Sequence, residues 1–181
     1  MKKTTFAGII ITALSLTGCG GGGGNANTPA NSPPATGAVA LATLDQNGSL
    51  PILNRDNTVT GIDVNANGVR DDIDAYIASL PDTVIQKAAL TQVSSALTSA
   101  MLVNVVDQAA LNTVMSKITN SVTCVDTRYN TATNITIGRD KGDLIRNLTI
   151  NTKTRFLAYE RFNAAMSGKS FKLPQGAGCV N

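Results

Sequence analysis

The fold is decided by residues 111–125, which read Leu-Asn-Thr-Val-Met-Ser-Lys-Ile-Thr-Asn-Ser-Val-Thr-Cys-Val. Apolar residues recur in this stretch at intervals of three and four, which places them on one face of an α-helix. They are Leu111, Val114, Met115, Ile118, Val122 and Val125. We expect this helix to begin near Val105 and to bury that face in a core.

The segments before this helix predict two more. A short helix is expected at Asp72–Leu80, where Pro81 ends it. Pro81 and Asp82 then open a longer helix whose apolar residues have the same helical spacing. These residues are Ile85, Ala89, Val93, Ala96, Leu97 and Met101.

The segments after residue 125 predict a loop and a last helical region. Residues 128–142 are rich in Thr and Asn and predict a loop, with a short strand at Asn134–Ile137. Helix is expected over Asp143–Gly168, interrupted at the β-branched run Thr149–Thr152. Its apolar stripe is Phe156, Leu157, Tyr159, Phe162 and Met166. The expected fold class is therefore mainly α, a small bundle of about four helices.

The composition excludes much of enzyme chemistry. The chain has 181 residues, of which 43% are hydrophobic but only 4% aromatic, so the core must be built from aliphatic side chains. Histidine is absent. Its absence removes the usual general base near neutral pH and every nucleophile that relies on an imidazole partner.

The N-terminus predicts export. Lys2 and Lys3 precede an apolar stretch from Phe6 to Leu16, which has the length and charge of a signal peptide. That stretch is too short to span a bilayer, which takes about 20 apolar residues.

Residues Leu16-Thr17-Gly18-Cys19 resemble a lipobox, the processing signal of bacterial lipoproteins. The resemblance implies that residues 1–18 are removed and that Cys19 carries the lipid that holds the protein to a membrane. Gly20 in the next position favours the outer membrane in that family. Residues 19–40 are rich in Gly, Asn and Pro and predict a flexible tether, which leaves residues 41–181 for a single domain.

Lipidation of Cys19 would leave two cysteines, Cys124 and Cys179. The cell envelope is oxidising, so we expect these two to form a disulfide. The bridge would pin the irregular tail, Ser170–Cys179, onto the end of the helix that contains residues 111–125.

Residues 63–74 carry a second chemically specific pattern. Oxygen-bearing side chains recur at every second residue, followed by Gly68 and two more aspartates, which suits a hard cation that takes six to eight oxygens. The expected ligands are Asp63, Asn65, Asn67, Asp71 and Asp74, with the backbone carbonyl of Val69. The spacing resembles the calcium loops of EF-hands, dockerins and thrombospondin type 3 repeats.

The calcium loop has a simpler alternative, in which Asn67-Gly68 is a turn, Asp71 is an N-cap, and Asp72 and Asp74 complement the helix dipole. A lone loop with two neutral ligands would bind calcium weakly, on the order of 10⁻⁴ to 10⁻³ M, as a structural ion.

Charge is distributed unevenly along the chain. Residues 19–127 include four basic and nine acidic residues, whereas residues 128–181 include nine basic and three acidic residues. The two halves can pair within the molecule, or the basic half can present a face to an anionic polymer or lipid. The candidates for such a face are Arg146, Lys153, Arg155 and Arg161. Nucleic acid is not expected, because no basic cluster is interleaved with aromatic residues.

Two functions follow from these features. The first is a membrane-anchored envelope lipoprotein, a non-catalytic binding or structural module that contacts peptidoglycan, an anionic glycan or an envelope protein. The second is a hydrolase of cell-wall or extracellular polymer with a carboxylate pair. Glu160, the only glutamate, would be one member of that pair, with Asp140 or Asp143 as the other.

Overall fold

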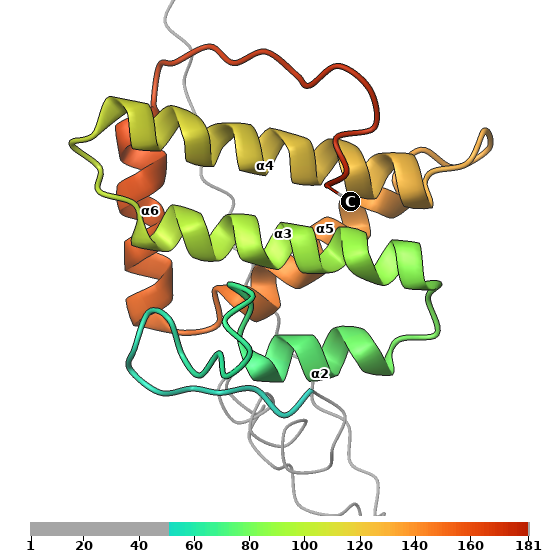
Figure 1. Cartoon of the computed structure of the whole chain (residues 1–181), viewed down its shortest axis with the longest axis horizontal. Coiled ribbons are helices and arrows are strands. Elements are labelled where there is room, and N and C mark those ends of the chain that lie inside the picture. The colour runs from blue at the N-terminus through green and yellow to red at the C-terminus, as the bar shows by residue number, and fades with distance from the viewer. Residues whose placement is uncertain (1–50, 181) are drawn as a thin grey trace, which may run out of the picture. The chain divides into compact units, whose positions relative to one another are not determined.

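The computed structural model describes residues 51–180, which belong to one compact unit. Within that range it contains five helices and no strand (Figure 1). The helices are α2 (Asp71–Ser79), α3 (Val84–Leu102), α4 (Gln108–Tyr129), α5 (Ile137–Thr149) and α6 (Lys153–Met166). The mainly α fold class is therefore confirmed. The expected signal peptide (1–18), Cys19 with its tether (19–40) and the first part of the expected domain (41–181) lie outside the described residues.

Helix α3 is the centre of the fold. It runs antiparallel to α4, α6 crosses behind the end where α3 stops and α4 begins, and α2 lies along the other side of α3 (Figure 1). Helix α3 contacts each of the other four described helices. A helix in that position must be apolar on more than one face, and the Ala- and Leu-rich sequence of α3 meets this requirement.

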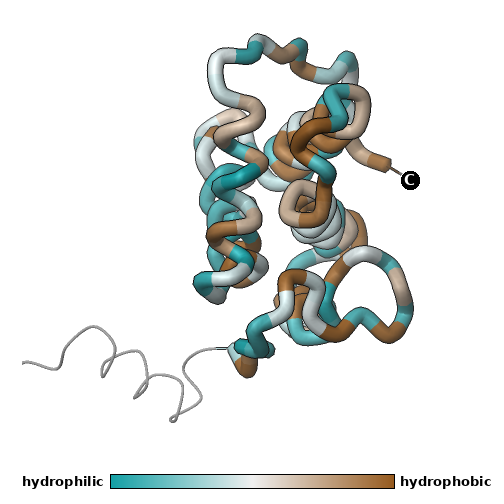
Figure 2. Tube along the Cα trace, turned by 90° about the vertical axis from the view of Figure 1, so that its left-hand side faces the viewer, coloured by the Kyte–Doolittle hydropathy of each residue, from teal (hydrophilic) through white to brown (hydrophobic). Residues whose placement is uncertain are grey.

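The core has two connected parts. The larger part is formed by aliphatic residues of α2, α3, α4 and α5, among which Ile73, Leu90 and Ile145 have no exposed surface. The smaller part lies where α6 meets the other end of α3 and α4, and contains Leu111 and Phe162. Hydrophobic and hydrophilic residues alternate along the tube rather than occupying separate segments (Figure 2), as expected for helices that bury one face each.

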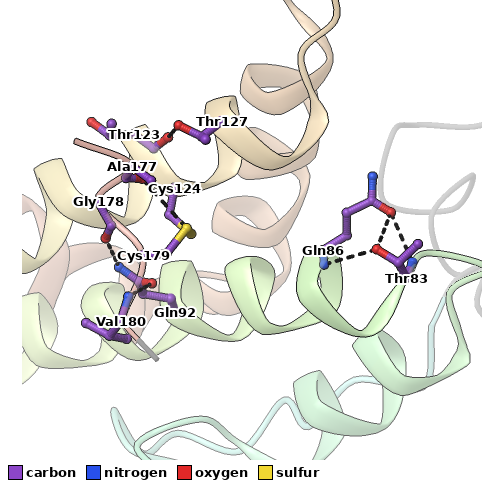
Figure 3. Close-up of a disulfide and its surroundings, with 10 residues drawn as sticks. All are labelled: Thr83, Gln86, Gln92, Thr123, Cys124, Thr127, Ala177, Gly178, Cys179 and Val180. Carbon is purple, nitrogen blue, oxygen red and sulfur yellow. Dashed lines mark hydrogen bonds between the residues drawn. A yellow bond between two sulfur atoms is a disulfide. The ribbon is translucent and has the colours of Figure 1, made fainter.

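Local sequence fixes where several helices begin. Thr83 and Gln86 form a reciprocal capping box at the start of α3 (Figure 3), two residues after Pro81. The Asp107 side chain accepts hydrogen bonds from two backbone N–H groups at the start of α4. Thr152 caps α6 in the same way, which produces the expected break between α5 and α6.

The expected loop at residues 128–142 is shorter in the structure, and the strand expected at Asn134–Ile137 is wrong. Helix α4 continues to Tyr129 and α5 already begins at Ile137. The reason is a tertiary contact. Asn130 accepts a hydrogen bond of 2.7 Å from the Gly138 N–H, and a Cβ at Gly138 would lie 2.6 Å from the Asp126 Cα. The glycine lets α5 start against α4, so packing overrides the loop-like composition.

The apolar stripe expected on α6 is only partly buried. Phe156 and Leu157 are half exposed, whereas the buried face consists of Arg155, Ala158, Phe162 and Met166. These four residues also have helical spacing. The face of α6 that meets the core therefore contains Arg155 and not Phe156. Ile85 on α3 and Val122 on α4, which were also expected in the core, are exposed by more than half.

The structure pairs Cys124 of α4 with Cys179 of the C-terminal tail, as expected. The tail runs from α6 across α4 (Figure 1) and is held beside the bridge by Gln92 (Figure 3). The Gln92 amide donates to the Gly178 carbonyl at 2.8 Å and accepts from the Val180 N–H at 3.0 Å. Gly178 has a φ of 69° and lies against the Asn120 carbonyl, where no side chain would fit.

Removal of the bridge should lower the free energy of unfolding without changing the helical fold. A crosslink across 55 residues contributes about 4 kcal/mol in the chain-entropy model. We expect a Cys124→Ala/Cys179→Ala variant to lose about this amount in urea unfolding followed by circular dichroism. The wild type with a reductant is the matched control and should unfold like the variant. Two free thiols trapped in the denatured, unreduced wild type would contradict the pairing.

Candidate functional site

A buried arginine attaches the irregular segment 51–70 to the helices. The Arg155 side chain of α6 has no exposed surface, and its guanidinium points into this segment. It donates to the Asn54 carbonyl at 2.8 Å, to the Val59 carbonyl at 3.3 Å and to the Asp56 carboxylate at 2.9 Å. Its other partner is the Asn151 side chain at 2.8 Å. Burial and the nearby charge of Arg70 lower the pKa of Arg155 from its ordinary value.

A second buried arginine lies beside the first. Arg70 makes a two-pronged ion pair with Asp72, at 2.9 and 2.8 Å, and donates to the Thr149 carbonyl at the end of α5 at 2.8 Å. Gly61, with a φ of 67°, lies against both arginines, and a Cβ there would collide with the Arg70 side chain. The two guanidinium groups therefore join the irregular segment to the region where α5 ends and α6 begins.

Arg155 does not belong to the exposed basic face expected from the sequence, because its charge is enclosed and fully hydrogen bonded. Of the other three candidates, Arg146, Lys153 and Arg161 are exposed. Arg146 pairs with Asp143 at 3.2 Å and lines a groove described below. Lys153 and Arg161 do not line that groove.

The candidate calcium loop at residues 63–74 curls around its own oxygen atoms. The Asp63 carboxylate accepts hydrogen bonds from the Asn67 N–H at 3.1 Å and the Gly68 N–H at 2.9 Å. One Asp74 oxygen accepts from the side-chain amides of Asn65, at 3.2 Å, and Asn67, at 2.8 Å. Gly68 has a φ of 80°, as a tight bend of this kind requires. The four side chains thus converge on one small region.

Asp71 has a different role from its neighbours. It is the first residue of α2, whose N-cap is Arg70, so the alternative in which Asp71 is the N-cap does not describe the loop. Its carboxylate accepts from the Val64 N–H at 3.1 Å and its own N–H donates to the Ile62 carbonyl at 2.9 Å. These bonds join the start of the loop, at residues 62–64, to the first residue of α2. Ile73 points into the core, as expected.

The donor set fits a hard cation by its chemistry, since every candidate atom is an oxygen. The described part of the chain contains no group of three or more carboxylate, thiol or imidazole side chains placed together to hold a metal. A cation in this loop would therefore depend on the Asn65 and Asn67 amide oxygens and on a backbone carbonyl, beside the carboxylates of Asp63 and Asp74. In the structure the Asn65 oxygen accepts from the Asn67 N–H at 3.0 Å and the Asn67 oxygen accepts from the Val69 N–H at 2.8 Å. Both amides would have to give up these bonds to turn their oxygens toward a cation.

A groove of about 350 Å³ lies between α4 and α5, with α3 beneath it, and we call it the α4–α5 groove. Its floor is apolar and its rim is charged. The lining comprises Val93, Leu97, Ile118, Ser121, Val122, Val125, Asp126, Ile135, Gly138, Arg139, Gly142, Asp143, Arg146 and Tyr159. Of these residues, only Arg146 and Asp143 were predicted from the sequence as functional candidates.

Glu160 lies in a neighbouring hollow that shares Arg146 and Tyr159 with the groove. It is exposed and accepts a hydrogen bond from the Asn163 amide at 3.0 Å. Among the described residues that line this hollow there is no second carboxylate. Asp143 belongs to the α4–α5 groove, and Asp140 lines neither space. Burial raises the pKa of the Tyr159 hydroxyl.

Comparison with known proteins gives no relative from which a function could be inferred. No family model, no curated protein and no solved structure matches this chain. Within residues 51–180 no helix is long and apolar enough to cross a membrane.

The arginine network and the α4–α5 groove were not predicted from the sequence. One signal for the network was present, because Arg155 lies at helical spacing from Ala158 and Phe162. A charged residue in an apolar stripe is normally assumed to be at its edge, and its partners lie about 100 residues away in the chain, as with Asn54. The groove depends on how far apart α4 and α5 lie, for which the sequence has no local signal.

The Asp72 ion pair should make stability sensitive to acid. Burial alone would raise the pKa of Asp72, but hydrogen bonds from Arg70 and the Asn54 N–H outweigh it and hold the pKa below 3.8. Because the folded state binds this proton less readily than the unfolded state, the contribution is full above about pH 5 and is lost as the pH falls through the folded pKa. We expect Asp72→Asn to lower the free energy of unfolding by about 2 kcal/mol at neutral pH. In urea unfolding at a series of pH values, its free energy of unfolding should also fall less steeply below about pH 5 than that of the wild type.

The matched control for this experiment is Asp140→Asn, at an exposed position on α5. Its free energy of unfolding should fall below about pH 5 as steeply as that of the wild type. The same decrease at acid pH in the wild type and in Asp72→Asn would contradict the role given to the Asp72 ion pair.

Proposed function

We propose that the protein is a lipid-anchored lipoprotein of the bacterial cell envelope, held at the outer membrane, whose helical domain is a non-catalytic binding module stabilised by calcium and a disulfide. The observation that carries the calcium part is the convergence of Asp63, Asn65, Asn67 and Asp74 in one loop. Their spacing in the chain suggested this loop, and the hydrogen bonds among them support it independently of that spacing.

Calcium would act on stability rather than as a signal. The loop contributes few negative charges, so the expected dissociation constant is on the order of 10⁻⁴ to 10⁻³ M, which suits an ion that is abundant outside the cell. Arg70 lies inside the loop sequence and is bonded to the end of α5. An ion that orders the loop would therefore also hold the irregular segment against the helices.

The non-catalytic part is supported by the side chains that are available. The chain has no histidine, and Glu160 is exposed in a hollow with no other carboxylate among its described lining residues. A hydrolase of the two-carboxylate type needs a second acid on the opposite side of the bond that is broken. The groove between α4 and α5, with its apolar floor and charged rim, has the character of a binding site.

The anchor is supported by the sequence alone, because Cys19 lies outside the described residues. Leu16-Thr17-Gly18-Cys19 has the lipobox pattern, and a charged and apolar leader precedes it. A Gly-, Asn- and Pro-rich tether follows and would separate the domain from the membrane surface.

Calcium should raise the melting temperature of the wild type. At a concentration ten times the dissociation constant, binding stabilises the folded state by about 1.4 kcal/mol. We expect this stabilisation at millimolar calcium. Asp74→Asn should abolish it, because the substitution removes one of the negative charges that would bind the ion. The measurements are thermal melts and calorimetric titration.

Magnesium at the same concentration and the Asp140→Asn variant are the controls for the calcium experiment. Magnesium should give a smaller shift, since it demands stricter geometry and loses its water reluctantly. A wild type that melts identically with and without calcium would sink the calcium proposal.

The lipid anchor should depend on Cys19 alone. We expect Cys19→Ala to move the protein from the membrane fraction to the soluble fraction and to stop its labelling with radioactive palmitate. Cys124→Ala, which breaks only the disulfide, should remain in the membrane fraction. A wild type that takes up no palmitate would contradict the proposal.

A further inference from the structure

The floor of the α4–α5 groove reaches the hydrophobic core. Val93 and Leu97 of α3 and Val125 of α4 line it, although each is more than nine-tenths buried. Above them the apolar lining continues to the surface, where Val122 is 52% exposed and Ile135 is 75% exposed. A molecule that covered these side chains would remove a continuous apolar surface from water, which favours binding.

Two glycines of α5 shape the groove in different ways. Gly138 is required by close packing, because a Cβ there would collide with the backbone of α4 at Asp126. Gly142, one turn later, has no such reason, since a Cβ there would meet nothing within 4 Å. Glycine in a helix interior is less favourable than alanine. At position 142 it leaves the space between α4 and α5 open, where any larger side chain would enter the groove.

Two arginines and two aspartates lie at the rim, and among the described residues one of the arginines makes no ion pair. Arg146 pairs with Asp143 at 3.2 Å. Asp126 of α4 lies against Gly138, which belongs to the first turn of α5. The positive end of the α5 dipole there offsets the negative charge of Asp126. Arg139 is exposed and makes no ion pair with any described residue. An acidic group on a ligand would therefore be attracted to Arg139.

We propose that the α4–α5 groove binds an anionic amphipath, with its apolar body on the floor formed by Val93, Leu97 and Val125 and its acidic head group at Arg139. The volume of about 350 Å³ is within the range of small-molecule sites. The inference rests on the binding role proposed above and names its ligand class, but it does not depend on calcium.

Other ligand classes fit less well. A neutral sugar would leave the apolar floor without a matching surface, and transferring its hydroxyl groups there without partners is unfavourable. A cationic amphipath would match the floor but would be repelled by Arg139. The combination of floor and rim thus selects for both an apolar body and a negative charge.

The test uses dodecanoate as the probe, below the concentration at which it forms micelles. The protein is the full mature chain with Cys19→Ala, exported behind a cleavable leader so that it carries no lipid and retains its disulfide. EDTA is present, which prevents calcium soaps and separates this test from the calcium experiment. Calorimetric titration should show saturable binding of dodecanoate, and dodecyltrimethylammonium, with the same chain and the opposite charge, should bind more weakly.

Variants assign the site. Gly142→Leu should abolish binding, because Gly142 lines the groove and a Cβ there has open space around it, so that a larger side chain can fill the groove. Val122→Glu, at an exposed position of α4, should weaken binding by placing a like charge at the rim, and it serves if Gly142→Leu fails to fold by circular dichroism. Arg139→Gln should weaken dodecanoate binding roughly two- to fivefold, as for an exposed ion pair. Arg161→Gln, exposed on α6 and outside the groove, should bind like the wild type.

Failure of the Cys19→Ala protein to bind dodecanoate would overturn the inference, and so would normal binding by the Gly142→Leu and Val122→Glu variants made in it. Equal affinity for the cationic probe would overturn the assignment of the head group to Arg139. If calcium binding and membrane anchoring hold while dodecanoate does not bind, the inference fails and the proposed function stands. A mature chain that hydrolyses cell-wall polymer would overturn the proposed function whatever the dodecanoate result.

Discussion

The structure of the N-terminal part of the domain depends on the burial of the Arg155 guanidinium. Isolated charges are costly to bury, and a buried arginine persists only where its donors are satisfied. Here all but one of the partners are supplied by residues 54–59, a segment without helix or strand, and Asn151 supplies the other. The arginine thus gains the acceptors it needs, and the segment gains a fixed position on α6.

This arrangement places the candidate calcium loop. Gly61 fits between Arg155 and Arg70, and the chain then enters the loop at residue 63 and leaves it in α2. Arg70 connects the loop to the last carbonyl of α5, so one hydrogen-bonded network joins the loop, α5 and α6. A cation in the loop would reinforce a connection that the arginines already make. That is consistent with a stabilising role, and it explains why weak binding would suffice.

The two ends of the described chain are fixed by different means. The segment at its start is held by buried arginines, and the tail is held by the Cys124–Cys179 bridge and Gln92. Both lie away from the opening between α4 and α5, whose shape is set by two glycines of α5. A covalent bond and buried ion pairs thus keep the irregular segments in place without filling the groove.

Several features could be predicted from local sequence: the helical class, the approximate positions of α2, α3 and α4, the pairing of the two cysteines and the position of the oxygen-rich loop. These features depend on local spacing, capping residues and chemistry, which neighbouring residues specify. Three features could not be predicted in this way: the start of α5 at Ile137, the burial of Arg155 beside an exposed Phe156, and the groove between α4 and α5. The physical reason is that each of these depends on contacts between residues far apart in the chain. The fit of Gly138 against Asp126 and the bonds from Arg155 to residues 54–59 outweigh the local preferences for loop and for an aromatic buried face.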